Sequence, residues 1–195
     1  MTAGRKRSEE SRSAILTGAV ELVREIGYGR LTIEGIAARA GVGKQTIYRW
    51  WPSRADVLFE ALATHADLEI SADDHGSYRA DLRAFLSESF ALAEASGVAE
   101  ILRPLMAEAQ LDPAFGDRFR DAFLTRRRAA LRRVLDRAAE RGDLPAQPPP
   151  DLVIDVVFGV LWYRVLATRE PLVPTLADEL TELLAPAASP APGAR

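Results

Sequence analysis

Residues 36–47 read IAARAGVGKQTI, a pattern that meets the size and spacing requirements of a helix-turn-helix. Ala37 is small where two helices have to cross closely, and Gly41, four positions later, supplies the residue for the turn. Ile47 then returns an apolar side chain to the first helix, so the second helix packs back against it. The stretch therefore predicts two short helices held at a fixed angle.

The outward face of the second helix carries polar side chains suited to a duplex groove. Three lie on its first turn, where base edges of a major groove are within reach: Lys44, Gln45 and Thr46. Three more follow on the outer face, with a phenol, a guanidinium and an indole N–H for phosphate oxygens: Tyr48, Arg49 and Trp50. An ordinary amphipathic helix with a solvated polar side is the alternative, which the turn geometry disfavours.

The flanking sequence predicts further helices around this motif. Apolar residues recur at steps of three and four from Ile15 to Ile26, and a glycine follows as a stop. Thr32 is placed to cap a helix that Gly41 ends. The next helix is predicted from Lys44 to Trp51. Ser53 and Asp56 then have capping-box spacing, at the start of a bridging helix that runs toward Ile70.

Helical periods continue beyond the polar linker 71–77, without a strand pattern. Residues 142–150 are predicted as a loop because three consecutive prolines cannot continue a helix. The last two helices are expected over residues 151–168 and 174–184. We therefore expect an all-α fold of about nine helices, organised as a helix-turn-helix head at 1–56, a helical body at 57–184 and a disordered tail at 185–195.

The helix expected over residues 151–168 is apolar nearly all round. In a protein without membrane spans this implies burial on two sides, by the chain's own core and by another subunit. The sequence thus predicts a homodimer through the helices Leu152–Leu166 and Leu176–Leu184, joined as a four-helix bundle.

Composition and charge limit the classes of function. The 195 residues include no cysteine, which excludes disulfides and cysteine-ligated metals, and the net charge is −3. Residues 1–56 carry ten Lys and Arg against six Asp and Glu, so a basic head on an acidic body suggests an anionic partner. The longest apolar run, residues 156–163, is far shorter than the roughly 20 residues of a membrane span. Residues 1–12 do not resemble a secretory signal, and we expect a cytoplasmic protein without a membrane partner.

Common enzyme motifs are incomplete in this sequence. Gly43-Lys44 does not complete a phosphate loop, because Ala38 and Gln45 stand where that motif needs glycine and a hydroxyl residue. The sequence predicts no catalytic residue, no metal site and no cofactor, and a small all-helical enzyme is a remote alternative. A metal at Asp73, Asp74 and His75 is disfavoured against a solvated linker. The arginines from Arg126 to Arg137 are expected on a solvated face, paired with carboxylates such as Asp136 and Glu140.

The segments TIEGIA at 32–37, GVGKQTIY at 41–48 and WPSRADV at 51–57 resemble the N-terminal pattern of the TetR family of one-component transcriptional regulators, over roughly residues 12–62. The resemblance implies a three-helix head and a helical ligand-binding and dimerisation domain. It further implies a repressor that binds palindromic operator DNA as a dimer and is released by a small molecule.

Carried over by position, the resemblance puts Lys44, Gln45 and Thr46 at base-reading places, and four residues at phosphates: Thr32, Tyr48, Trp50 and Arg54. The sequence also departs from the family pattern. Gly43 replaces the usual cap of the recognition helix, Gly35 replaces the acidic partner of the cap before it, and Trp50 stands where histidine or tyrosine is common. We expect a somewhat softer head for this reason.

A ligand pocket in the body is expected for a small apolar or aromatic effector. Its candidate lining residues are Phe85, Phe90, Arg103, Met106, Phe119, Phe123, Phe158 and Trp162. For each of these residues, plain core packing is the competing interpretation. A DNA-binding adaptor that is regulated by a protein partner is the alternative function. The operator, the effector, the regulated genes and the choice between repressor and activator are not encoded in any motif.

Overall fold

The computed structural model describes residues 3–65, 71–95 and 97–186, without the side chains of residues 3–7 and 65. The helices are α1 (Ala3–Ile26), α2 (Ile33–Ala40), α3 (Lys44–Tyr48), α4 (Arg54–His65), α5 (Tyr78–Glu94), α6 (Val98–Leu111), α7 (Pro113–Phe119), α8 (Thr125–Arg141), α9 (Pro150–Trp162) and α10 (Pro174–Leu184). A 3-10 turn, η1 (Tyr28–Arg30), and two π-helical segments, η2 (Arg120–Leu124) and η3 (Tyr163–Thr168), complete the set. Since α7, η2 and α8 are continuous, as are α9 and η3, the described residues form nine helices besides η1. The expected all-α fold is confirmed.

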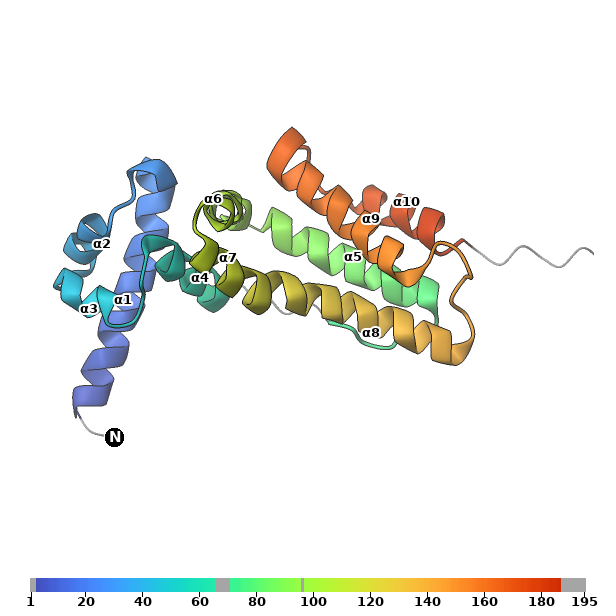
Figure 1. The fold of residues 1–195 in the computed structure, drawn as a ribbon, viewed down its shortest axis with the longest axis horizontal. Coiled ribbons are helices and arrows are strands. Elements are labelled where there is room, and N and C mark those ends of the chain that lie inside the picture. The colour runs from blue at the N-terminus through green and yellow to red at the C-terminus, as the bar shows by residue number, and fades with distance from the viewer. Residues whose placement is uncertain (1–2, 66–70, 96, 187–195) are drawn as a thin grey trace, which may run out of the picture. The chain divides into compact units, whose positions relative to one another are not determined.

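The chain divides into two compact units. One holds α1–α4 with α6 and α7, and in it α1 packs against α2 and α4 while α4 also packs against α6. The other holds α5 and α8–α10, and there α5 contacts both α8 and α10, as Figure 1 shows. The boundary expected at residue 56 divides the chain by function rather than by packing, and it stays a prediction.

The ends of the first helices follow the local chemistry of the sequence. Gly27 has φ 77° after α1, and Gly41 has φ 65° after α2, a left-handed conformation that glycine adopts at little cost. Thr32 Oγ1 accepts a hydrogen bond from Gly35 N at 3.0 Å and so caps α2. At the start of α4, Asp56 N donates to Ser53 Oγ at 3.2 Å, and the Ser53 hydroxyl donates to the Asp56 carboxylate at 2.7 Å.

The predicted end of the third helix was wrong. α3 stops at Tyr48, and the amides of Trp50 and Trp51 both turn back to the carbonyl of Ile47, each at 2.9 Å. Trp51 is buried, and Pro52, which follows it, disfavours helical backbone at Trp51. The helix that carries the candidate base-reading residues is therefore a short one.

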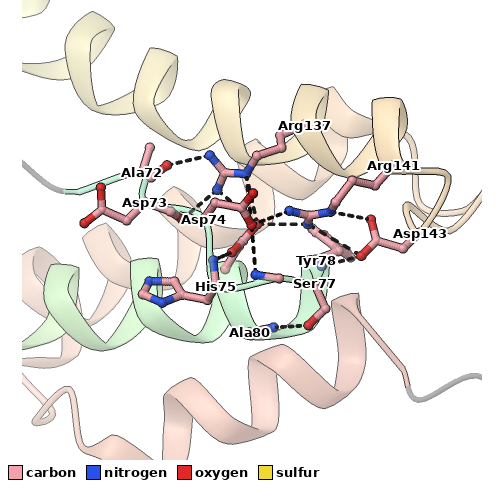
Figure 2. Close-up of polar contacts among 12 residues, drawn as sticks. Ala72, Asp73, Asp74, His75, Ser77, Tyr78, Ala80, Arg137, Arg141 and Asp143 are labelled. Atoms are coloured by element: carbon pink, nitrogen blue, oxygen red, sulfur yellow. Dashed lines mark hydrogen bonds and ion pairs between the residues drawn. The ribbon is translucent and has the colours of Figure 1, made fainter.

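In the second unit, a buried carboxylate ties the linker 71–77 to α8. Asp81 is 1% exposed; one oxygen accepts from His75 N at 2.6 Å, and the other accepts from Arg137 at 3.0 Å and Arg141 at 2.9 Å. Arg137 also donates to the carbonyl of Ala72 at 2.6 Å, and Figure 2 shows how the two guanidinium groups lie over the linker. The linker is thus fixed by hydrogen bonds.

The interpretation of the arginines from Arg126 to Arg137 as a solvated face agrees with the exposed Arg126, Arg128 and Arg133 but is wrong for Arg127. Arg127 is 6% exposed, its guanidinium lies 5.3 Å from the centroid of the Phe123 ring, and burial lowers its pKa to about 10. Arg128 pairs with Asp155 of α9 at 2.9 Å. These partners lie far along the chain or on the helix's inner side, whereas the prediction considered only carboxylates within one or two turns.

The packed part of the chain continues one residue beyond the predicted last helix. α10 spans residues 174–184 as expected, and Ala185, which the prediction assigned to the tail, is buried in the core of the second unit. The rest of the predicted tail from residue 187 lies outside the described residues. Within the described part of the chain, no helix combines the length and the apolar character needed to cross a bilayer.

Candidate DNA-binding surface

The two helices α2 and α3 are locked together by buried apolar residues and by the turn. Ile36 and Ile47 are fully buried, and Ala37 is 6% exposed. Within the turn, Val42 N donates to the carbonyl of Ala37 at 3.0 Å, so α3 starts at a fixed position relative to the end of α2. The spacing of the sequence thus yields a rigid corner, in which Ile47 faces α2 and the exposed side chains of α3 face away from it.

The exposed face of α3 carries most of the residues selected from the sequence. Four of them have exposed side chains: Lys44, Gln45, Tyr48 and Arg49. Thr46 and Trp50 are half-buried. The set forms one surface, with Lys44 and Gln45 on the leading turn and the larger side chains after it.

Lys44 has a neighbour that the sequence did not indicate. Its Nζ lies 3.6 Å from Glu34 Oε1, and both side chains are more than half exposed. An exposed pair of this kind contributes about 0–1 kcal/mol, so it holds the lysine weakly. The ammonium group is therefore available to a stronger acceptor.

Arg49, Trp50 and Trp51 form a stack at the end of α3. The guanidinium of Arg49 lies 4.9 Å from the Trp50 ring centroid, and the rings of Trp50 and Trp51 meet edge to face at 5.3 Å. The Trp51 indole N–H donates to Glu60 Oε2 at 2.7 Å, which anchors the stack to α4. The outer two members are thus presented on a fixed base.

Thr32 and Arg54 lie beside this surface with internal partners of their own. Thr32 is exposed, although its oxygen caps α2. Arg54 is half-buried, donates from Nη1 to the carbonyl of Leu31 at 2.5 Å and lies 4.4 Å from the centroid of the Tyr28 ring. No local sequence pattern predicts the contacts of Arg54 with Leu31 and Tyr28, because they join residues more than 20 positions apart.

Comparison with known proteins assigns the chain to a family. The model described as "Bacterial regulatory proteins, tetR family" matches residues 15–61, and that described as "Tetracyclin repressor-like, C-terminal domain" matches residues 72–184. The chain belongs to the TetR family of transcriptional regulators. Among relatives, the HTH-type transcriptional regulator YdeS of Bacillus subtilis (strain 168) is 30% identical over 167 residues, which cover 86% of this chain and 84% of YdeS.

Solved TetR-family structures share the fold. The TetR family transcription regulator SCO0332 is 29% identical, with a TM-score of 0.66 over 92% of this chain and all of that one. AibR in complex with isovaleryl coenzyme A and operator DNA has a TM-score of 0.62 at 21% identity, over 90% of this chain and 98% of AibR. The chain is thus a DNA-binding regulator with a helix-turn-helix, and it is not an enzyme.

The residues proposed for a ligand pocket divide between the two units of this TetR-family fold. Five belong to the second unit: Phe85, Phe90, Phe123, Phe158 and Trp162. Four of these rings form two edge-to-face pairs, Phe85 with Phe158 at 6.4 Å and Phe123 with Trp162 at 6.3 Å. The other three belong to the first unit: Arg103, Met106 and Phe119. Of these, Phe119 is fully buried and stacks on Phe115 at 5.8 Å.

The helices selected for dimerisation have an inner and an outer apolar face. Val153, Val157 and Leu161 are buried in the core of the second unit. On the other side, large apolar side chains are exposed at Leu152 (49%) and Tyr163 (63%). Three more follow on η3, before α10 and on α10: Leu166, Val173 and Leu183. Both helices therefore carry exposed apolar side chains in addition to those in the core.

Proposed function

We propose that the chain is a TetR-family repressor that binds palindromic operator DNA as a homodimer and is released by a small ligand. The observation that carries the DNA part is the rigid α2–α3 corner, whose buried side is Ile36 and Ile47 and whose exposed side begins with Lys44 and Gln45. A helix presented in this way fits a major groove with its first turn against the bases.

The contacts divide by chemistry. Lys44, Gln45 and Thr46 read base edges, and the longer side chains Tyr48, Arg49 and Trp50 bind phosphates. Thr32 donates its hydroxyl proton to a phosphate, because its oxygen is already occupied by the cap of α2. Arg54 reaches a phosphate with the part of its guanidinium that does not hold Leu31.

A homodimer sets the distance between two such helices. The exposed apolar residues of α9, η3 and α10 support an interface through Leu152–Leu166 and Leu176–Leu184, because burial of such side chains by a second subunit would remove them from water. A twofold dimer presents its recognition helices about 34–36 Å apart, one turn of the duplex. A protein with this partner and this task acts in the cytoplasm.

The ligand is a small molecule with an apolar or aromatic part. The aromatic residues of the second unit are the proposed binding region: Phe85, Phe90, Phe123, Phe158 and Trp162. AibR binds isovaleryl coenzyme A, which makes short acyl-coenzyme A thioesters sensible first probes. A ligand that binds one dimer geometry more tightly than the other shifts the population away from the DNA-competent spacing.

Selection of bound fragments from random duplex DNA tests the DNA part of the proposal. Recovery of an inverted repeat with half-sites about one helical turn apart supports the dimer and the head together. Recovery of fragments without any shared sequence contradicts base reading by α3. If a sequence is recovered but none of the acyl thioesters or aromatic acids tested raises the thermal midpoint or releases DNA, the adaptor alternative is favoured.

A further inference from the structure

Three side chains from three helical elements meet at the start of the helix-turn-helix. Tyr28 Oη donates to Glu108 Oε2 at 2.9 Å, which joins η1 to α6. Arg54 is the first residue of α4, and its guanidinium lies 4.4 Å from the Tyr28 ring centroid. The same guanidinium donates to the carbonyl of Leu31 at 2.5 Å. All four residues lie within the first unit.

The carbonyl that Arg54 holds belongs to the residue directly before the cap of α2. Leu31 is fully buried and extended, with φ −67° and ψ 130°. Thr32 then caps Gly35 N with its side chain, and its own carbonyl accepts from Ile36 N at 3.0 Å. The orientation of the peptide at 31–32 therefore sets the direction in which α2 begins. Only residues 41–43 separate α2 from α3, so that direction is passed on to Lys44.

We infer that Tyr28, Arg54 and Glu108 are positioning residues for DNA reading, which fix the start of α2 and couple its orientation to α6. The inference rests on the proposed base-reading role of α3. It makes Glu108, which lies 80 positions from Tyr28, a determinant of base preference although it is not part of the DNA surface. A shift of α6 changes the hydrogen bond to Tyr28 and thereby the angle of the recognition helix.

The Tyr28 phenol stays protonated well above neutral pH. Burial first, and the hydrogen bond to Glu108 second, raise the pKa of Tyr28 to about 12. The phenol is therefore protonated and remains a donor. Tyr28→Phe removes this donor and keeps the ring under Arg54, so it is a specific test of the link.

Backbone hydrogen exchange tests the positioning without DNA. In Tyr28→Phe and Glu108→Ala, we expect the amide of Ile36, in the first turn of α2, to exchange about tenfold faster than in the unmodified protein. Glu108→Gln keeps an acceptor oxygen and should restore most of the protection. Glu100→Ala is the matched control, because Glu100 is an exposed glutamate on the same helix. Unchanged exchange in both Tyr28→Phe and Glu108→Ala would overturn the inference.

Binding to duplex DNA tests the consequence. For the same two variants, the ratio of affinities for the selected site over random duplex should fall about fivefold, as expected for loss of one charge-assisted hydrogen bond. The random-duplex affinity of Tyr28→Phe should not change. The double variant should resemble the single ones, because both substitutions remove the same bond. Multiplicative losses, or equal losses on both DNAs, would mean general destabilisation and refute the positioning role, whereas failure of Lys44→Ala to alter base preference would refute the proposed base reading alone.

Discussion

Lys44 combines an exposed position with a weakly held partner. Its ammonium group is 3.6 Å from Glu34, and the two side chains are 55% and 66% exposed. Solvent screening leaves such a pair little energy, and a guanine edge offers O6 and N7 as stronger acceptors. Glu34 also reduces the net positive charge beside Lys44, which disfavours purely electrostatic contacts of this surface with the DNA backbone.

Replacement of Lys44 by alanine should therefore relax base preference more than it weakens binding in general. We expect a loss of about 1–3 kcal/mol on the selected site and a much smaller loss on random duplex. Arg49→Ala, which removes a proposed phosphate contact, should weaken both and reduce the slope of affinity against salt by about one. Titration by fluorescence anisotropy at several salt concentrations measures both quantities. Equal effects of the two variants on both DNAs would contradict the division of roles.

Asp81 is the residue at which the pH dependence of folding can be predicted. Burial acts to raise its pKa, but the amide of His75 and the guanidinium groups of Arg141 and Arg137 lower it by more, so the pKa lies below the usual value of 3.8. The folded state therefore binds this proton less readily than the unfolded chain. The resulting stability is present above about pH 4 and is lost as the pH falls through the pKa of the folded state.

Asp81→Asn should lower the free energy of unfolding by about 3 kcal/mol near neutral pH, because Arg137 and Arg141 lose the buried carboxylate that pairs with them. The difference between the variant and the unmodified protein should shrink as the pH falls below about 4. Urea unfolding at a series of pH values measures it, and Asp136→Asn on the exposed side of α8 is the matched control. A difference that stays constant into acid would show that Asp81 does not act through its charge.

At the scale of elements, local chemistry predicted where helices start and end. Glycines and capping side chains determine those ends by contacts within a few positions, as at Thr32 and Gly41. The end of α3 was predicted three residues too late, at Trp51 instead of Tyr48, although Pro52 is a local signal that disfavours helical backbone before it. The partners of Arg128 and Tyr28 were also missed, because Asp155 and Glu108 lie 27 and 80 positions away. Periodicity identifies a buried face, but it does not identify the facing residue.

Gly35 destabilises α2, and a substitution at this position can raise the free energy of unfolding. It lies inside α2, where alanine is more favourable by about 1 kcal/mol. A Cβ at this position would lie 3.2 Å from Thr32 Oγ1 and 3.9 Å from Leu22, a slight crowding that the exposed threonine can relieve. Gly35→Ala should therefore raise the free energy of unfolding by about 0.5–1 kcal/mol. Chemical denaturation measures it, with Gly29→Ala in η1 as a control because a Cβ there would meet no atom within 4 Å. A loss of stability in Gly35→Ala would mean that the added methyl group strains the cap.

At the scale of the whole molecule, the apolar residues of α9 and η3 fall into two groups, one packed in the core and one exposed. Val153, Val157 and Leu161 face the core, whereas Leu152, Tyr163 and Leu166 are exposed. The exposed residues and the half-buried Val156 recur at steps of three, four and seven, which places them on one face of the helix. The sequence predicted association from the lack of a polar side, and the exposed fractions identify which residues would form it.

Charges introduced on this face should separate the subunits. Tyr163 and Leu183 are 63% and 67% exposed, so glutamate at either position is tolerated by the single chain but is buried without a partner in the proposed interface. We expect Tyr163→Glu and Leu183→Glu to sediment as monomers at micromolar concentration. Leu111→Glu is the matched control, because Leu111 is 79% exposed on α6, outside the proposed interface. A monomeric unmodified protein would contradict the dimer directly.

The same variants connect the interface to DNA reading. A dimer gains from a second half-site because its second recognition helix binds at high effective concentration, whereas a monomer has no such gain. Tyr163→Glu and Leu183→Glu should therefore bind a palindrome and an isolated half-site with similar affinity, although Lys44 and Gln45 are unchanged. Leu111→Glu should keep the preference for the palindrome. If the charged variants keep that preference as well, a surface other than α9, η3 and α10 sets the spacing of the recognition helices.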